Sequence, residues 1–352
     1  MRNRRRNPLA VLAAIARAAH SGAFVKDGAH LEALSEVETA VFDKTGTLTS
    51  GAPVVQRIDV VPGIDEEELL FLLATAESYS EHPLAKAVVE HLRERGTAAG
   101  APDSFEYRPG MGVVARVGGR TVVAGNSSLV ADAPDSGDVE GSPIHVSVDG
   151  AYRATAILAD AVRPGAAAAV AELKGMGLQV AMVTGDGAGA ARAVGARLGI
   201  DDCRAELLPE QKTAFIDSLR AAGCKVAMVG DGVNDAPSLA RADVGIAMGS
   251  GTDVARDSAD VVLVASDPAD LASTVRVARR ARAIVTFNFV GTVAVDLVGM
   301  ALAAAGILTP VLAAIVHVGS ETAFILNSAR LIPGKTVRRR TRLGKRSGGA
   351  EA

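Results

Sequence analysis

The sequence predicts an α/β protein in which a doubly wound parallel sheet is interrupted by an inserted α+β segment and followed by a C-terminal helical hairpin. Three observations support this fold class. Short apolar strands alternate with helices before and after the insertion. Residues 53–158 instead show two helices and then Gly-punctuated strands. Residues 284–331 hold two apolar stretches of membrane-spanning length.

The strands expected in the parallel sheet end close to polar residues. Apolar runs stop at or just before Asp43, Thr184 and Asp231. Because ligands bind outside the carboxyl ends of such strands, we expect these three side chains to converge. The expected strands are Thr39–Phe42, Gln179–Val183, Lys225–Val229, Val244–Ala247 and Val261–Val264, alternating with helices Pro164–Met176, Ala188–Leu198 and Glu210–Ala221.

The insertion has a different character. We expect helices over Asp65–Ala76 and Pro83–Arg95, and then antiparallel strands. The expected strands are Val113–Val117, Thr121–Ala124, Ile144–Val148 and Tyr152–Leu158. A helical region from Pro8 to Ala33, turning at Gly22, with a second short helix near His30–Ser35, is expected before the first strand. The predicted domains are a linker over 1–36, a sheet domain over 37–52 and 159–278, the insertion over 53–158, the hairpin over 284–331, and a basic disordered tail over 332–352.

Composition and charge narrow the class of protein. The chain has 352 residues, 49% of them hydrophobic, which suits soluble domains with a few membrane spans. A net charge of -3 gives no general bias toward nucleic acid, and we expect no nucleic-acid partner. Cys203 and Cys224 form no CxxC pair, which excludes a disulfide framework and argues against a zinc site. Arginines cluster near both ends of the sequence, next to apolar segments. We therefore expect both termini and the soluble domains to lie on the cytoplasmic side of the inner membrane.

The strongest motif is Asp43-Lys44-Thr45-Gly46-Thr47-Leu48-Thr49. A carboxylate at a strand end can attack a phosphoryl group whose oxygens are held by the N–H groups of a Gly-containing loop. These seven residues resemble the phosphorylation motif of P-type ATPases, in the haloacid dehalogenase superfamily, which implies that Asp43 is the nucleophile with Lys44 and Thr45 beside it. In that superfamily the second position after the nucleophile usually carries an Asp that acts as acid and base. Here that position is Thr45, which implies a long-lived aspartyl-phosphate rather than rapid phosphatase turnover.

Three later motifs extend the resemblance. The resemblance implies that the hydroxyl of Thr184, in Thr184-Gly185-Asp186, donates to the phosphoryl oxygens. It also implies that Lys212 neutralises the charge of the phosphate in the transition state. Asp231-Gly232-Val233-Asn234-Asp235 implies a Mg²⁺ site built from Asp231, Asp43 and the Thr45 carbonyl, with Asn234 and Asp235 tuning it. Magnesium is the expected ion because carboxylate and phosphate oxygens form the hard ligand shell it prefers.

The insertion resembles the ATP-binding domain of the heavy-metal-transporting class. Ser80-Glu81-His82-Pro83 resembles a motif of that class, and Glu77 stands one helical turn before Glu81. Gly110 and Gly112 would let the backbone approach the nucleotide, and Gly125 with Asn126 would close the pocket. Asp160 and Arg163 fall where the family's hinge joins the two domains, with a plain surface ion pair as the alternative.

Polar residues within the hairpin invite a functional interpretation, because they are costly in a bilayer. His317 and Glu321 share one helix face and, with Asp296, are candidate ligands for a transported cation. The His-led stretch favours a divalent transition metal over monovalent copper. Helix–helix hydrogen bonding is the alternative for Asn288 and Ser320.

The resemblance covers residues 8–331 but only the later part of the family's architecture. No Thr-Gly-Glu, Cys-Pro-Cys or Ser-Pro-Cys motif occurs in the sequence. We therefore expect a truncated or mis-started gene, or a second polypeptide that supplies an actuator domain and further helices. Two alternatives to an ATP-driven pump stay open: a membrane-anchored phosphatase of the haloacid dehalogenase type, and a nucleotide-binding partner subunit that does not transport.

Overall fold

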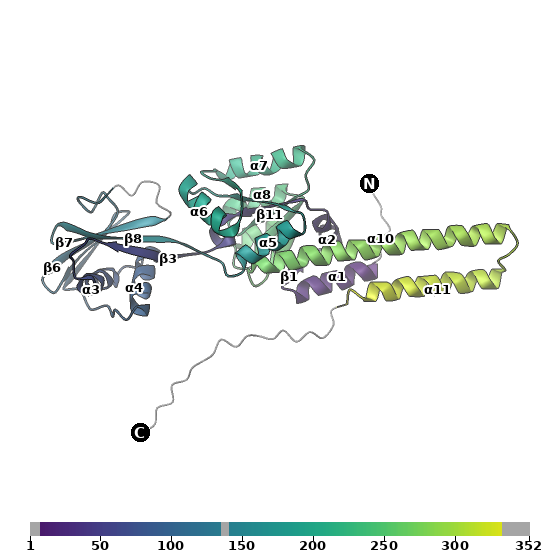
Figure 1. Ribbon diagram of the computed structural model, residues 1–352, viewed down its shortest axis with the longest axis horizontal. Helices are drawn as coiled ribbons and strands as arrows, with labels where there is room; N and C mark the ends of the chain where they lie inside the picture. Colours follow the sequence, from purple (N-terminus) through teal and green to yellow (C-terminus); the bar gives the residue numbers. More distant parts are fainter. Residues whose placement is uncertain (1–7, 135–140, 333–352) are drawn as a thin grey trace, which may run out of the picture. The chain divides into compact units, whose positions relative to one another are not determined.

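A computed structural model describes residues 8–134 and 141–332 (Figure 1). The arginines before Pro8 lie outside these residues, and so does the predicted basic tail from residue 333 on. The chain divides into two compact units, residues 22–279 and residues 1–21 together with 280–352.

The larger unit contains a seven-stranded sheet in the order β1-β13-β12-β11-β2-β9-β10. Neighbouring strands pair in parallel, except that β1 is antiparallel to β13 at one edge. Strand order runs outward in both directions from β2, which confirms the predicted doubly wound class. The strands are β1 (Ala23–Val25), β2 (Thr39–Asp43), β9 (Gln179–Val183), β10 (Asp202–Arg204), β11 (Val226–Gly230), β12 (Val244–Met248) and β13 (Val261–Leu263).

The middle of this sheet is buried on both faces. Every residue of β2, β11 and β12 is buried, as expected of parallel strands that are covered by helices. Ile216 and Leu239, from two of these helices, belong to one apolar core with Val41 and Met228 of the strands. The helices of this domain are α2 (Gly28–Ser35), α5 (Ala166–Gly175), α6 (Ala188–Leu198), α7 (Pro209–Ala221), α8 (Ala236–Arg241) and α9 (Asp253–Ser258).

The insertion forms a separate six-stranded antiparallel sheet in the order β3-β8-β7-β6-β5-β4. Leu69, Leu73 and Leu92 from its two helices pack into one core with Val122 and Val146 of the sheet. The elements are β3 (Thr49–Val60), α3 (Glu66–Glu77), α4 (Pro83–Glu94), β4 (Ser104–Arg108), β5 (Gly112–Val117), β6 (Arg120–Gly125), β7 (Ser142–Val148) and β8 (Ala151–Val162).

Several elements differ from the expectation. Strand β3 was not predicted, because Val55 is its only buried apolar residue and its pairing with β8 holds it in place. Strands β1, β4 and β10 were also missed; β1 and β10 have only three residues each, too few to show a period. The helical region expected from Pro8 to Ala33 is broken by β1, since α1 ends at His20.

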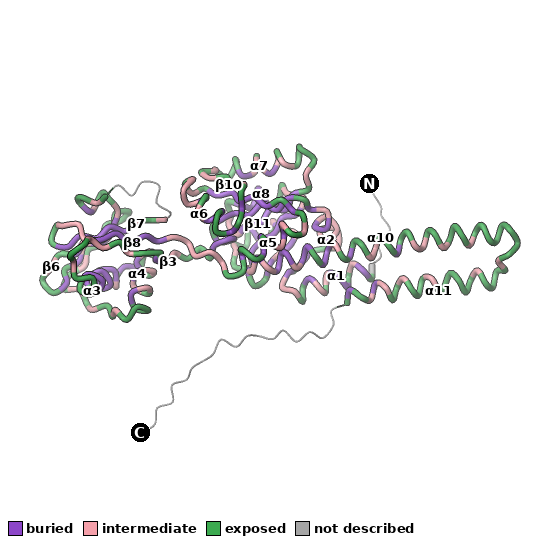
Figure 2. Tube along the Cα trace, in the orientation of Figure 1, coloured by how far each residue is buried: buried purple, intermediate pink, exposed green. Residues whose placement is uncertain are grey.

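The smaller unit is helical. It comprises α1 (Pro8–His20), α11 (Pro310–Ala329) and the later part of α10, a helix that runs without interruption over Pro268–Ala304. Both α10 and α11 are long and apolar enough to cross a membrane. Only 11% and 6% of their apolar windows are buried, and Figure 2 shows the hairpin as mostly exposed. This exposure argues against a pair of core helices in a soluble protein.

Candidate active site

Asp43 is the last residue of β2, and its side chain is buried. The chain leaves the strand through a tight turn, Lys44–Leu48, in which Thr45 and Gly46 have non-helical backbone angles; we name it the catalytic turn. Gly46 in this turn has φ +73°, and a Cβ atom there would overlap the carboxylate of Asp231. A glycine is therefore required both by the backbone conformation and by the close approach of Asp231.

Lys212 projects from the first turn of α7 toward two carboxylates. Its Nζ lies 2.5 Å from Asp43 Oδ1 and 3.1 Å from Asp235 Oδ1, and all three side chains are buried. Burial acts to lower the pKa of Lys212, but the charges of Asp43 and Asp235 outweigh it and raise that pKa above its ordinary value. Lys212 is therefore a fixed positive charge at the Asp43 carboxylate.

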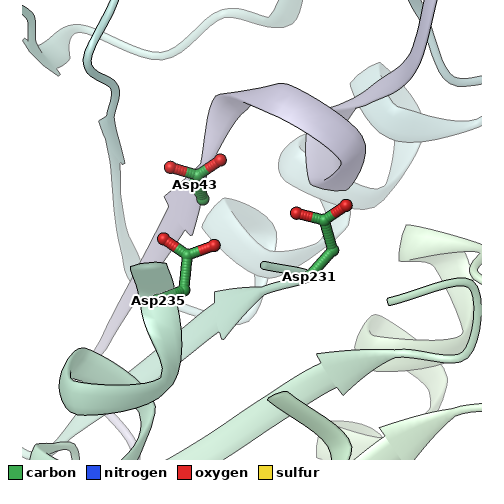
Figure 3. A group of neighbouring side chains, drawn as sticks. All are labelled: Asp43, Asp231 and Asp235. Atoms are coloured by element: carbon green, nitrogen blue, oxygen red, sulfur yellow. The ribbon is translucent and has the colours of Figure 1, made fainter. Parts of the chain in front are cut away.

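Asp43, Asp231 and Asp235 bring carboxylate oxygens within 4.8 Å of one another (Figure 3). Burial, and then the charge of Asp235, raise the pKa of Asp43 to about 7, although Lys212 acts in the opposite direction. Burial and Asp235 likewise raise the pKa of Asp231. Such crowding of negative charge is relieved by a divalent cation, and an all-oxygen donor set suits Mg²⁺. The residues present therefore fit a magnesium ion.

Thr184 follows β9, the strand next to β2. Asp43 is paired with Val183, so the buried Thr184 stands one residue beyond the position of Asp43 at the same edge of the sheet. Its Oγ1 accepts a hydrogen bond from the backbone N–H of Asp186. The Asp186 carboxylate forms an ion pair with Lys44 of the catalytic turn. This ion pair directly joins the Thr184-Gly185-Asp186 motif to the catalytic turn.

The other candidates at this edge are exposed. Thr45, Gly185 and Asn234 all have exposed positions, on the catalytic turn, after β9 and after β11 respectively. The exposed Thr45 side chain offers no carboxyl group beside Asp43.

Asp160 and Arg163 belong to the end of β8 and its continuation. Thr49 Oγ1 donates to Asp160 Oδ2 at 3.4 Å. Arg163 Nη2 donates to Gly46 O at 2.6 Å and to Ser250 Oγ at 3.3 Å. The structure therefore places both side chains beside the catalytic turn, and neither lines the pocket of the inserted domain where nucleotide-binding residues were expected.

The inserted domain contains a pocket of about 210 Å³. Six of the residues predicted for the nucleotide line it: Glu77, His82, Gly110, Gly112, Gly125 and Asn126. Glu81 and Pro83 are exposed and lie outside the lining. Ser80 of the Ser-Glu-His-Pro motif and Met111, between the two predicted glycines, also line the pocket; Tyr107 was missed because strand β4 was not recognised.

Glu77 is the buried acid of this pocket. Burial raises its pKa to about 7, so its carboxyl group changes charge near neutral pH. His82 is exposed and caps α4, because its Nδ1 accepts from the N–H of Leu84 at 3.3 Å. One ring nitrogen of His82 is thus used locally and the other is left for a ligand.

The glycines of the pocket bring two strands together. Gly112 and Gly125 are paired between β5 and β6. A Cβ atom on Gly112 would collide with the carbonyl of Ala124. Asn126 Nδ2 donates to Gly110 O at 3.0 Å and so closes the same corner. These residues shape the pocket wall through close packing of backbone.

Known proteins resemble this chain over most of its length. Residues 37–243 match the family model of haloacid dehalogenase-like hydrolases. The chain is 40% identical over 340 residues to a manganese-exporting P-type ATPase of Mycobacterium tuberculosis, covering 92% of this chain and 47% of that protein. It is 31% identical to the solved catalytic domain of the CPx-ATPase CopB-B, with a TM-score of 0.60, covering 73% of this chain and 97% of that domain.

The chain belongs to the heavy-metal P-type ATPases, within the haloacid dehalogenase-like hydrolases. A crystal structure of a zinc-transporting PIB-type ATPase in its E2.Pi state also matches, with 34% identity, a TM-score of 0.85, and coverage of 93% of this chain and 55% of that one. The chain spans about half the length of the curated relatives it matches.

Among the described residues, the hairpin of this P-type ATPase contains two clusters of polar side chains. Asn288 Nδ2 donates to Ser328 Oγ at 2.9 Å, and Asn327 Nδ2 donates to Asn288 Oδ1 at 2.8 Å, which ties α10 to α11. Asn288 thus has the helix–helix role that was the alternative for it. Ser320 Oγ donates to the carbonyl of His317 within its own helix.

The second cluster of polar side chains contains the candidate cation ligands. His317 Nδ1 lies 3.6 Å from Asp296 Oδ1, and its Nε2 lies 3.6 Å from Glu321 Oε1. The three side chains are between 49% and 58% exposed, so they form a polar patch on an otherwise apolar hairpin.

Proposed function

We propose that this chain is the ATP-using part of a pump for a divalent transition metal, and that Asp43 carries the phosphoryl group. The observation that carries the proposal is the position of Lys212 Nζ, 2.5 Å from Asp43 Oδ1, with the Asp231 carboxylate in the same cluster. A nucleophilic carboxylate, a fixed ammonium group and an acidic cation site are the parts that phosphoryl transfer requires.

In the proposed reaction one Asp43 oxygen forms a bond to the γ-phosphorus of ATP, and the bond from that phosphorus to the bridging oxygen breaks, which releases ADP. Lys212 neutralises charge on the attacking and transferred oxygens, and the Thr184 hydroxyl donates to the phosphoryl group. Asp43, Asp231 and the Thr45 carbonyl, with Asp235 close by, would hold Mg²⁺, which would stabilise the phosphate oxygens electrostatically.

ATP is proposed to bind in the pocket of the inserted domain. Tyr107 and Met111 offer a partly exposed aromatic and thioether surface for the purine ring. Glu77 at the base of the pocket, when neutral, can both donate to and accept from the edge of an adenine. His82 presents its second ring nitrogen at the rim.

The proposed cargo site is the patch of Asp296, His317 and Glu321. Imidazole together with carboxylates suits divalent transition metals better than Cu(I), which prefers sulfur ligands. A patch this polar is costly against lipid tails, so further membrane helices are proposed to cover it, in the same or in a second polypeptide.

The proposed orientation keeps the larger unit in the cytoplasm. Arg279, Arg280 and Arg282 precede the apolar part of α10, and Arg330 follows α11. Positive charge at the same end of both helices fits a hairpin that enters and leaves from the cytoplasmic face of the cell membrane.

The test is labelling of the membrane-embedded chain by ATP carrying ³²P in the γ position. The proposal predicts acid-stable, hydroxylamine-sensitive label that is absent from Asp43→Asn and whose level responds to Mn²⁺, Zn²⁺ or Co²⁺. Label that persists in Asp43→Asn would overturn the nucleophile. Rapid hydrolysis of a small phosphate ester, without stable label, would favour the phosphatase. Nucleotide binding without any label would favour the partner subunit.

A further inference from the structure

We propose that Arg163, Ser250 and Ser266 form a positioning network that holds Asp231 against Asp43 and so sets the affinity of the site for Mg²⁺. The inference deepens the proposed function, because it concerns the same phosphorylation site. None of these three side chains belongs to the carboxylate cluster itself. Their effect is exerted through the backbone that carries the carboxylates.

Arg163 joins two loops that lie far apart in sequence. Its backbone N–H donates to Leu48 O at 2.8 Å, and its Nη2 donates to Gly46 O at 2.6 Å, which fixes the middle and the last residue of the catalytic turn. The same Nη2 donates to Ser250 Oγ at 3.3 Å. The side chain is partly buried, so these bonds are only partly exposed to competing water.

Ser250 belongs to a loop that supports Asp231. In this loop the N–H of Thr252 donates to the carbonyl of Asp231 at 2.8 Å. A Cβ atom on Gly251 would lie 2.6 Å from that carbonyl oxygen, so the two backbones are in direct contact. On its other side the Asp231 carboxylate meets Gly46 of the catalytic turn. Asp231 is thus held between two segments, and Arg163 connects them.

Ser266 completes the network from the loop after β13. Its Oγ accepts from the N–H of Ser250 at 2.7 Å and donates to Ser250 Oγ at 2.9 Å, and the residue is 7% exposed. Its φ of +54° is a left-handed conformation that a glycine would adopt with less strain. The hydrogen bonds between the Ser266 hydroxyl and Ser250 therefore offset the backbone strain that a glycine would avoid.

Second-layer groups of this kind commonly change metal affinity by about 10- to 100-fold, because they orient the ligands. Loss of the network is expected to loosen Asp231 relative to Asp43 while leaving the ATP pocket of the inserted domain unchanged.

The test is isothermal titration of the full chain in detergent with MgCl₂, using Asp231→Asn to subtract binding elsewhere. We expect Arg163→Met to weaken the Asp231-dependent site about 10-fold or more, and Ser250→Ala and Ser266→Gly to weaken it several-fold. Arg163→Lys should recover part of the affinity, because an ammonium group can still donate to both oxygens. The matched controls are the exposed Arg116→Met and the half-buried Ser258→Ala, whose hydroxyl donates only within its own helix to Val254 O among the contacts described; both remove the same groups away from the network.

Wild-type affinity in Arg163→Met, or losses no larger than those of the two controls, would overturn the inference, and so would the absence of Asp231-dependent binding in the wild type. If Arg163→Met does not fold, the two serine variants decide the matter by the same comparison. If the wild type binds Mg²⁺ at the Asp231-dependent site and the variants weaken that binding as expected, but ATP never labels the chain, the proposed function is wrong and the network stands.

Discussion

Lys212 Nζ lies 2.5 Å from Asp43 Oδ1, although the two residues are 169 positions apart in the chain. The contact crosses from α7 to the end of β2, and Asp235 holds the same ammonium group from the other side. In the proposed reaction, Asp43 therefore meets the incoming phosphate with a counter-charge already in place, which lowers the reorganisation needed during transfer.

Lys212→Met should slow phosphorylation of Asp43 by about 100-fold or more, the usual effect of removing one preorganised donor from a reacting centre. The measurement is the rate of ³²P incorporation from ATP in a rapid-quench experiment. Lys174→Met is the control, because Lys174 binds Asp201 and the Gly199 carbonyl at the surface. An unchanged rate in Lys212→Met would rule out its role in transfer.

Thr45→Asp should shorten the life of the phosphoenzyme. The threonine side chain is exposed beside the nucleophile, so a carboxyl group fits there and can act as a general base on water. We expect label chased with unlabelled ATP to disappear about 100-fold faster. Thr45→Asn, of equal size but without a base, should retain the slow decay. Equal decay in the two variants would mean that Thr45 does not explain the stability of the intermediate.

Glu77 should make the inserted domain less stable as pH rises. Its pKa is about 7 in the folded chain against 4.5 for an unperturbed Glu, so between these values the unfolded state releases the proton first and is favoured. The free energy of unfolding should therefore fall by up to about 3 kcal/mol between pH 4.5 and pH 7.5. Glu77→Gln should remove this slope, whereas Glu94→Gln, at an exposed position, should keep it.

The chain offers a selective probe for this prediction. It has no Trp and three Tyr, and Tyr79, Tyr107 and Tyr152 all lie in the inserted domain. Tyrosine fluorescence during urea unfolding of the full chain thus reports on that domain. A slope that is the same in wild type and Glu77→Gln would show that another group is responsible.

His317→Ala should abolish the response of phosphorylation to transition metals without reducing ATP binding, because it removes the group between Asp296 and Glu321. Ser320→Ala is the control, since that hydroxyl bonds only to its own helix among the contacts described. The measurement is the metal concentration that gives half-maximal change in label. A wild-type response in His317→Ala would exclude this patch as the cargo site.

Part of the proposed phosphorylation site could be predicted from sequence because three of its residues follow apolar strands, and parallel strands end at one edge. Asp43, Thr184 and Asp231 needed only that rule to be placed together. Lys212 is different: it lies on a helix, and only the family resemblance pointed to it.

Other features could not be predicted, for identifiable physical reasons. β3 is mostly exposed and gains its structure from pairing with β8, so its sequence carries no period of its own. The role of Arg163 depends on a contact with Gly46, 117 residues away, which no local pattern encodes. The bond between Asn288 and Ser328 likewise appears only when the hairpin closes.

The most direct test of the account is chemical identification of the phosphorylated residue. Borohydride reduces an aspartyl-phosphate to homoserine, so the chain is incubated with Mg-ATP, quenched, reduced, and its tryptic peptides are sequenced by mass spectrometry. The account predicts homoserine at position 43 in the peptide ending at Lys44, and none there in Lys212→Met sampled within the first turnover. Homoserine at any other aspartate, or an unmodified Asp43 in a chain that carries label, would contradict it.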